Sequence, residues 1–139
     1  MMLGIGVDIV DIARFERQLE RTPALLPRLF AEAERALPVP SLAVRFAAKE
    51  ALIKALGDSG GLGWHDIEIV RNEDRAPSFV RTPGLEREFA ARGAARAHLS
   101  LSHDSGDAIA FVILEGATSL GTDAAAEATG TTSEMGAAA

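Results

Sequence analysis

Large apolar residues alternate with small or polar residues near the beginning of the chain, between residues 3 and 10. A period of two residues predicts a β-strand. Two glycines on the face that carries an acid leave room for another part of the chain to approach the backbone closely. The two faces are Leu3, Ile5, Val7 and Ile9 on one side, and Gly4, Gly6, Asp8 and Val10 on the other.

A helical period follows this strand. Asp11 is a suitable N-cap for a helix that runs to about Glu20. A second helix is predicted from Thr22 to about Leu37, and the Pro-Val-Pro segment after it forces a break. One face of the first helix carries three arginines and the next segment adds a fourth: Arg14, Arg17, Arg21 and Arg28.

The next predicted helix is the longest. Ser41 can cap it, and Gly57 ends it. Large apolar residues cover one broad arc and alanines fill most of the rest, so we expect this helix to be buried on much of its circumference. Four charged residues lie within the apolar arc or at its border: Arg45, Lys49, Glu50 and Lys54.

Short strands and one more helix are predicted in the second half of the chain. The expected strands span residues 64–70, 78–81, 97–102 and 108–114, and the expected helix spans residues 83–92. This order of elements favours an α+β fold. Residues 1–115 are predicted to form one domain, and residues 116–139, which are mostly Ala, Thr, Gly and Ser, a disordered low-complexity tail.

The composition argues against several kinds of protein. The absence of cysteine excludes a disulfide scaffold and is compatible with the cytoplasm. The first residues lack the basic region of a signal peptide, and no apolar run approaches the roughly 18 residues of a membrane span, so we expect no membrane partner. The net charge of −6 argues against a general nucleic-acid binder, which needs a dominant basic surface.

Both lysines of the chain lie in the long helix, whereas the other twelve basic residues are arginines. Lys49 and Lys54 flank Glu50. Because an ammonium group and a guanidinium group are not interchangeable at a binding site, this spacing favours a phosphate site beside a carboxylate. The alternatives are chance and, for Lys49, a side chain that lies along apolar surface with its charge in water.

Two carboxylates could also bind a metal ion. Asp8 lies near the end of the first strand and Glu50 on the long helix, and carboxylates with water are suitable ligands for Mg²⁺. The candidate phosphate ligands are Arg45, Lys49, Lys54 and His103, of which the last could instead move a proton. Each residue also has an ordinary alternative: Asp8 could be a cap, and His103 could be a turn residue. Glu50 and Lys54 could form a surface pair worth about 0.2–0.5 kcal/mol. Phosphoryl chemistry is therefore one option among several.

Three segments carry a more specific pattern. They are Gly4-Ile5-Gly6-Val7-Asp8-Ile9-Val10, then Arg45-Phe46-Ala47-Ala48-Lys49-Glu50-Ala51 continuing to Lys54-Ala55-Leu56-Gly57, and Leu101-Ser102-His103-Asp104. In this order they resemble holo-acyl-carrier-protein synthase, the short type of 4′-phosphopantetheinyl transferase. The resemblance covers about residues 2–115. It implies the phosphopantetheinyl transferase fold, a small mixed or antiparallel sheet packed on a long central helix.

The resemblance also implies a reaction. The 4′-phosphopantetheine arm of coenzyme A would be transferred to a serine of an apo acyl carrier protein, for fatty acid synthesis, with release of adenosine 3′,5′-bisphosphate. Asp8 and Glu50 would bind Mg²⁺, and Glu50, directly or through water, would accept the serine proton. The implied catalytic residues are Asp8, Glu50 and Lys54, and the implied ligands of coenzyme A are Arg45, Lys49, Lys54, Ser102 and His103. Val10 stands where larger relatives have a third acidic metal ligand.

Partners follow from the same resemblance. The short type is a homotrimer with active sites between subunits, so a trimer is implied here. Carrier proteins are acidic around their serine, and the implied contacts are Arg14, Arg17, Arg21 and Arg28, although a solvated helix face is the alternative. Two other functions stay open: transfer to the carrier domain of a type I fatty acid synthase, and a non-catalytic module that binds coenzyme A or a carrier protein.

Overall fold

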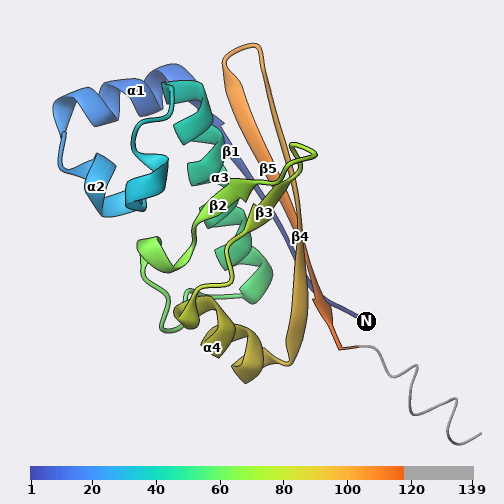
Figure 1. Cartoon of the computed structure of the whole chain (residues 1–139). Coiled ribbons are helices and arrows are strands. Elements are labelled where there is room, and N and C mark those ends of the chain that lie inside the picture. Colours follow the sequence, from blue (N-terminus) through green and yellow to red (C-terminus); the bar gives the residue numbers. More distant parts are fainter. Residues whose placement is uncertain (118–139) are drawn as a thin grey trace, which may run out of the picture.

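A long helix that lies across one face of a three-stranded sheet forms the frame of this protein (Figure 1). The computed structural model describes residues 1–117. The sheet has the order β1-β5-β4, and both neighbouring pairs are antiparallel. These elements are β1 (Met2–Asp11), β4 (Ala94–Asp104), β5 (Asp107–Gly116) and the helix α3 (Val39–Leu56). The predicted α+β class, with a small sheet on a long central helix, is confirmed.

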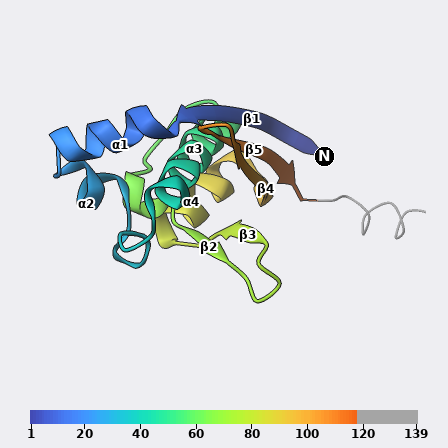
Figure 2. The same cartoon turned by 90° about the horizontal axis from the view of Figure 1, so that it is seen from above.

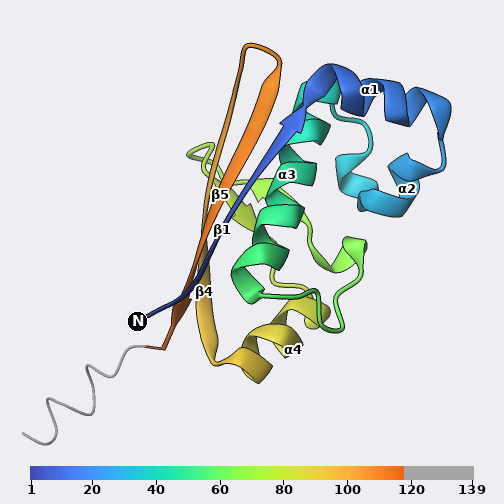
Figure 3. The same cartoon turned by 180° about the vertical axis from the view of Figure 1, so that it is seen from behind.

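Smaller elements surround α3. Two short helices and a 3₁₀ turn cover one end of it, and another helix covers the other end (Figure 3). Seen from above, a two-stranded hairpin lies on the side of α3 away from β1 (Figure 2). These elements are α1 (Ile12–Arg21), α2 (Leu25–Leu29), η1 (Glu32–Glu34), η2 (Trp64–Asp66), β2 (Ile69–Arg71), β3 (Pro77–Phe79) and α4 (Pro83–Arg92).

The glycine face of β1 packs directly against α3, as the sequence predicts. A Cβ atom added to Gly4 would overlap the carbonyl oxygen of Ala55, and one added to Gly6 would overlap that of Ala51. Only glycine therefore allows this close approach of strand and helix. Asp8 follows on the same face, so the contact brings its carboxylate next to α3.

The opposite face of β1 and β5 is apolar and is not covered by any element that the structure describes (Figure 1). Val7 is 52% exposed and Ile9 is 62% exposed. Strand β5 extends the same surface, because Val7 pairs with Phe111 and Ile9 pairs with Ile109. We call this surface the outer apolar face; it comprises Leu3, Ile5, Val7, Ile9, Ile109 and Phe111.

Local capping signals predict α1 and α4 well. Oδ1 of Asp11 accepts a hydrogen bond from the backbone N–H of Arg14 at 2.9 Å, which caps α1. Gly93 ends α4 with a left-handed φ of 70°. The strands predicted at 97–102 and 108–114 are confirmed, but β4 and β5 are longer than the pattern indicates.

Several predicted boundaries are wrong, among them those of the strand expected at residues 78–81, because β3 spans Pro77–Phe79. The second helix stops at Leu29 because the backbone of Phe30 is extended and its side chain is fully buried. Helix α3 begins before Ser41, with Pro40 in the first turn, where a missing N–H costs nothing. The strand expected at residues 64–70 begins only at Ile69. Its first three predicted residues form the 3₁₀ turn η2, in which Oδ2 of Asp66 accepts a hydrogen bond from the backbone N–H of Gly63.

Strand β5 ends at Gly116, the first residue of the predicted tail. Residues 118–139 of that tail lie outside the described residues. Within residues 1–117, no helix has the length and apolar character needed to cross a membrane.

Candidate active site

Asp8 and Glu50 line the same pocket, which has a volume of about 430 Å³. Strand β1 supplies Asp8 from its glycine face, and α3 supplies Glu50. Helix α1 supplies another wall, including Arg14 and Gln18. The packing of β1 on α3 therefore brings two carboxylates that are distant in the sequence to one pocket.

The surroundings of Glu50 disfavour its charged form. Burial raises the pKa of this carboxyl group above its ordinary value of 4.5, and the negative charge of Asp8 raises the pKa further. The positive charge of Lys54 opposes both effects. A carboxylate with a raised pKa is a stronger base than usual, so Glu50 is suited to accept a proton.

Lys54 binds Asp8, and the surface pair with Glu50, which was the ordinary alternative to a functional site, is not formed. Its Nζ donates hydrogen bonds to Oδ1 of Asp8 and to the carbonyl oxygen of Val7, both at 3.0 Å. The Lys54 side chain is 55% exposed. Its ammonium group therefore lies beside the carboxylates and can also bind an incoming anion from solvent.

The donor set suits a hard divalent cation. A cation near Asp8 and Glu50 would relieve the repulsion that raises the pKa of Glu50. Within residues 1–117 there is no cluster of three or more His, Cys, Asp or Glu side chains. Val10, which lines the same pocket, offers no side-chain oxygen. Two carboxylates would thus leave several positions to water, as Mg²⁺ commonly requires.

Lys49 does not reach this pocket, contrary to its predicted contact with a phosphate. Its side chain is 0% exposed, and Nζ donates hydrogen bonds to Oε1 of Glu34 at 2.7 Å and to the carbonyl oxygen of Leu29 at 2.8 Å. Burial lowers the pKa of Lys49, and the hydrogen bond that Lys49 donates to Glu34 opposes this shift. An enclosed ammonium group has no free direction for a phosphate, so Lys49 belongs to the protein interior.

Arg45 also faces Glu34, with 3.7 Å between Nε and Oε2. Among the described residues its buried Nε has no hydrogen-bond partner. Burial lowers the pKa of Arg45, Glu34 opposes this, and the charge of Arg71 lowers it further. Arg45 lies about 140° around the helix from Glu50 and does not line the carboxylate pocket.

Comparison with known proteins identifies the family. A sequence model described as the 4′-phosphopantetheinyl transferase superfamily matches residues 4–112. This chain belongs to that superfamily. The resemblance noted in the sequence and the fold that it implies are both confirmed.

Relatives of this transferase carry one name. The protein named holo-[acyl-carrier-protein] synthase of Leifsonia xyli is 64% identical over 115 residues, which are 83% of this chain and 98% of the relative. The crystal structure of the synthase from Neisseria meningitidis matches with a TM-score of 0.77 and 34% identity, over 83% of this chain and 99% of that one. The synthase of Helicobacter pylori, solved in complex with coenzyme A, matches with a TM-score of 0.71 and 34% identity, over 80% and 99%.

Two predicted coenzyme A ligands of the transferase lie on β4, level with Ile9 of β1 but separated from it by β5. Ser102 pairs with Ile109 and His103 pairs with Ala108. Because directly paired residues share a face, Ser102 lies on the side of the outer apolar face. His103 is exposed beside the turn between β4 and β5. Neither residue lines the carboxylate pocket, so one chain does not bring all the predicted ligands together.

A second pocket of about 450 Å³ adjoins the carboxylate pocket of the transferase. The two pockets share Phe15, Gln18 and Phe46. Phe46 stacks on Phe15 with 5.3 Å between ring centroids and contacts Trp64 at 5.7 Å, so the floor is aromatic. The sequence pattern assigns Phe15 and Phe46 to apolar stripes, and it contains no signal that they border a site.

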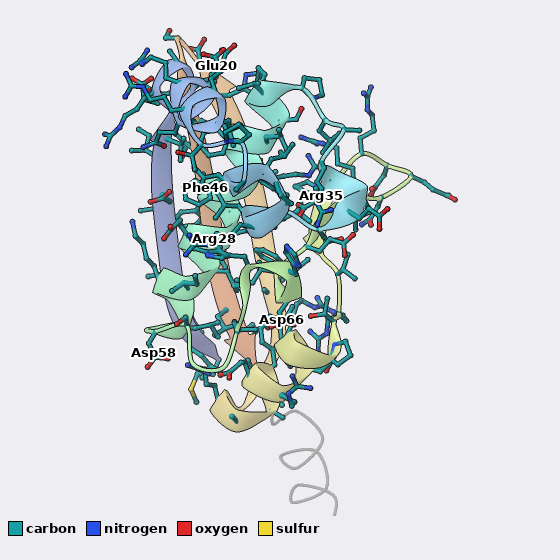
Figure 4. The ribbon with its side chains drawn as sticks, turned by 90° about the vertical axis from the view of Figure 1, so that its left-hand side faces the viewer. Glu20, Arg28, Arg35, Phe46, Asp58 and Asp66 are labelled. Carbon is teal, nitrogen blue, oxygen red and sulfur yellow. The ribbon has the colours of Figure 1, made fainter. Side chains whose placement is uncertain are left out.

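The predicted arginine surface is only partly gathered around these pockets. Arg14 lines the carboxylate pocket, and Arg21 and Arg28 line the second pocket. Arg28 and Phe46 are seen on this side of the molecule in Figure 4. Arg17 is exposed but lines neither pocket. We call Arg14, Arg21 and Arg28 the arginine rim.

Proposed function

We propose that this chain transfers the 4′-phosphopantetheine arm of coenzyme A to a serine of an apo acyl carrier protein. The observation that carries the proposal is the meeting of Asp8 and Glu50 in one pocket, with Lys54 beside them, in a member of the phosphopantetheinyl transferase superfamily. The names of the relatives and the coenzyme A complex of one of them support the same reaction.

The proposed reaction exchanges one bond to phosphorus for another. The serine oxygen bonds to the phosphorus of the phosphopantetheine group, and the bond from this phosphorus to the bridging oxygen of the pyrophosphate breaks. Adenosine 3′,5′-bisphosphate leaves with that oxygen. Glu50, directly or through water, accepts the serine proton. Lys54 neutralises negative charge on the phosphates, the main requirement of phosphoryl transfer.

The proposed cofactor is Mg²⁺, held by Asp8 and Glu50 together with water. Only oxygen donors are available from these two side chains, and such donors favour hard cations. When bound, the ion would supply positive charge next to the phosphate oxygens. Asp8 would then bind the ion. Lys54 would hold the Asp8 carboxylate in its orientation when no ion is bound.

The proposed assembly is a homotrimer formed through the outer apolar face. A soluble monomer rarely leaves so many adjacent large apolar side chains in water, and such patches commonly mark interfaces. Assembly would also explain why Ser102 and His103 do not line the carboxylate pocket of their own chain. They would contribute to the site of a neighbouring subunit and contact the nucleotide phosphates of coenzyme A there.

The proposed docking site of the carrier protein is the second pocket with its arginine rim. An acidic surface that presents one apolar side chain would match an aromatic floor bordered by Arg21 and Arg28. This pocket adjoins the carboxylate pocket, so a serine next to the docked surface can reach Glu50. Arg17 would act only through its charge, at longer range.

The test is the intact mass of a purified apo acyl carrier protein after incubation with this chain, coenzyme A and Mg²⁺. We expect a gain of one phosphopantetheine unit, and we expect EDTA to prevent it. Glu50→Ala should fold normally and transfer nothing, which separates a catalyst from a module that only binds coenzyme A.

The identity of the carrier is tested in the same assay. A free-standing carrier protein and an excised carrier domain of a type I fatty acid synthase are compared at equal concentration. Modification of only one of them assigns the substrate, and modification of neither contradicts the proposed function.

A further inference from the structure

Helix α2 holds Arg28 but cannot be stable by itself. It has only five residues, Leu25–Leu29, and no side chain caps its N-terminus. Isolated helices of this length do not form in water, and the last carbonyl groups of any helix lack partners within it. The position of Arg28 therefore depends on contacts that other parts of the chain make with α2.

Side chains from distant segments bind the carbonyl groups on either side of Arg28. Nε2 of His65, in η2, lies 2.6 Å from the carbonyl oxygen of Pro27. Nζ of Lys49, in α3, donates to the carbonyl oxygen of Leu29 at 2.8 Å. A carbonyl oxygen can only accept, so Nε2 of His65 carries the proton of this bond. Donors at these positions replace the missing turn of the helix.

The donors to these carbonyl groups differ in surroundings. Nη2 of Arg35 also donates to the carbonyl oxygen of Pro27, but at 3.4 Å it lies farther away than Nε2 of His65. Lys49 is fully buried and also bonds to Glu34, so its removal would disturb the protein interior. His65 is exposed, and the hydrogen bond to Pro27 is the only side-chain bond it makes among the described residues. Its neighbour Trp64 lines the same pocket as Arg28. His65 thus connects two walls of this pocket, α2 and η2, without belonging to the carboxylate pocket.

We propose that His65 is a positioning residue for carrier-protein recognition: by binding the carbonyl oxygen of Pro27 it fixes Arg28 and the width of the second pocket. This inference rests on the proposed docking of the carrier protein at that pocket. It assigns to His65 no contact with coenzyme A and no part in the chemical step.

The first experiment is steady-state kinetics with an apo acyl carrier protein and coenzyme A. His65→Ala should raise the KM for the carrier protein about two- to tenfold, the range expected for one hydrogen bond, and leave kcat and the KM for coenzyme A unchanged. His65→Gln, which keeps an N–H donor, should stay near the wild-type value. The proposal would be overturned if the KM for the carrier protein is unchanged. It would also be overturned if kcat and the KM for coenzyme A change as much as the KM for the carrier protein does.

A double-mutant cycle separates positioning of Arg28 from a general effect. Arg28→Ala should raise the carrier KM, and adding His65→Ala should then raise it little further. Arg87→Ala, an exposed arginine on α4 that is far from both pockets, is the matched charge control. Additive effects of Arg28→Ala and His65→Ala would overturn the proposal. If Arg28→Ala itself has no effect, the proposed docking site fails instead.

Hydrogen exchange tests the contact without any assay of transfer. The amides of Arg28 and Phe30, which donate to Ala24 and Leu26 within this turn, should exchange faster in His65→Ala than in wild type or His65→Gln. Equal protection in all three proteins would overturn the positioning role. If the wild-type protein transfers nothing to any carrier but His65→Ala still exchanges faster, the structural role of His65 would be supported and only the proposed function would fail.

Discussion

Nζ of Lys49 and Oε1 of Glu34 lie 2.7 Å apart, in side chains that are at most 1% exposed. The same carboxylate accepts a hydrogen bond from the backbone N–H of Ala31 at 3.1 Å. Glu34 therefore joins α3 to the segment after α2, and Lys49 is the link on the helix side. The neighbouring position in sequence is Glu50, so the buried pair also fixes the orientation of the helix that holds the proposed base.

Substitution of Lys49 should mainly reduce stability, whereas substitution of Lys54 should mainly reduce activity. Lys49→Ala leaves Glu34 buried without its cation, so the free energy of unfolding should fall by about 3–5 kcal/mol. Lys54→Ala removes an exposed cation, so it should change the stability little but lower kcat strongly. Denaturant unfolding and transfer kinetics measure both effects. A stable Lys49→Ala variant that has lost only its coenzyme A binding would return Lys49 to the phosphate site.

Glu50→Gln should abolish transfer and raise stability at neutral pH. The folded protein binds the Glu50 proton more tightly than the unfolded chain does, because its pKa is raised from 4.5. The charged form therefore costs stability as the pH rises through the raised pKa, and this cost is absent at lower pH. We expect a gain of a few degrees in Tm at neutral pH and none below pH 4.5. Glu73→Gln, in the exposed hairpin turn, is the control; a lower Tm of Glu50→Gln at neutral pH would contradict the interpretation.

Asp8→Asn should weaken the binding of Mg²⁺ to the protein by an order of magnitude or more, because it removes one of two anionic ligands. Isothermal titration with Mg²⁺ alone measures this without any transfer. Asp74→Asn, in the exposed turn between β2 and β3, is the matched control and should bind as wild type does. Equal affinity in all three proteins would remove Asp8 from the proposed metal site.

Arg14→Glu should raise the KM for the carrier protein and leave the binding of coenzyme A nearly intact. A charge at the border of an interface mainly changes the association rate, so the effect should be largest at low salt. Arg87→Glu, on α4, makes the same change in net charge away from the pockets. Carrier kinetics that are unchanged at low salt would show that this part of the arginine rim is not a docking surface.

Val7→Glu should prevent assembly, because it places a charge in the centre of the outer apolar face. Size-exclusion chromatography with light scattering should give three chains for the wild type and one chain for the variant. Transfer should be lost as well if the site is shared between subunits. Val70→Glu, which changes another exposed valine on β2, is the control and should remain a trimer. A monomeric wild type would contradict the proposed assembly.

Local patterns were sufficient where one segment determines its own structure. Asp11 caps α1 and Gly93 ends α4 because both signals act within a few residues. The glycines of β1 were also informative, since a face without side chains predicts close packing. From these elements and the family motif, the meeting of Asp8 and Glu50 could be anticipated.

Long-range contacts could not be predicted in this way. The partner of Lys49 is Glu34, and nothing in the spacing of the two residues indicates that they meet in the interior. The early end of the second helix has the same origin, because Phe30 leaves the helix to enter the core while Lys49 binds the carbonyl oxygen of Leu29. A helical period indicates which residues could share one face of a helix. It does not indicate which of them will leave the helix because their side chains pack elsewhere in the core.

The alternation along β1 has a consequence for how errors in strand pairing are avoided. If β1 moved by one residue along β5, Ile5 and Val7 would turn toward α3, and Asp8 would turn away from Glu50. The backbone of Ala51 and Ala55 leaves no space even for a Cβ atom at that contact. A misaligned chain could therefore not close its helix onto its sheet, so the glycines exclude the inactive arrangement during folding as well as allowing the active one.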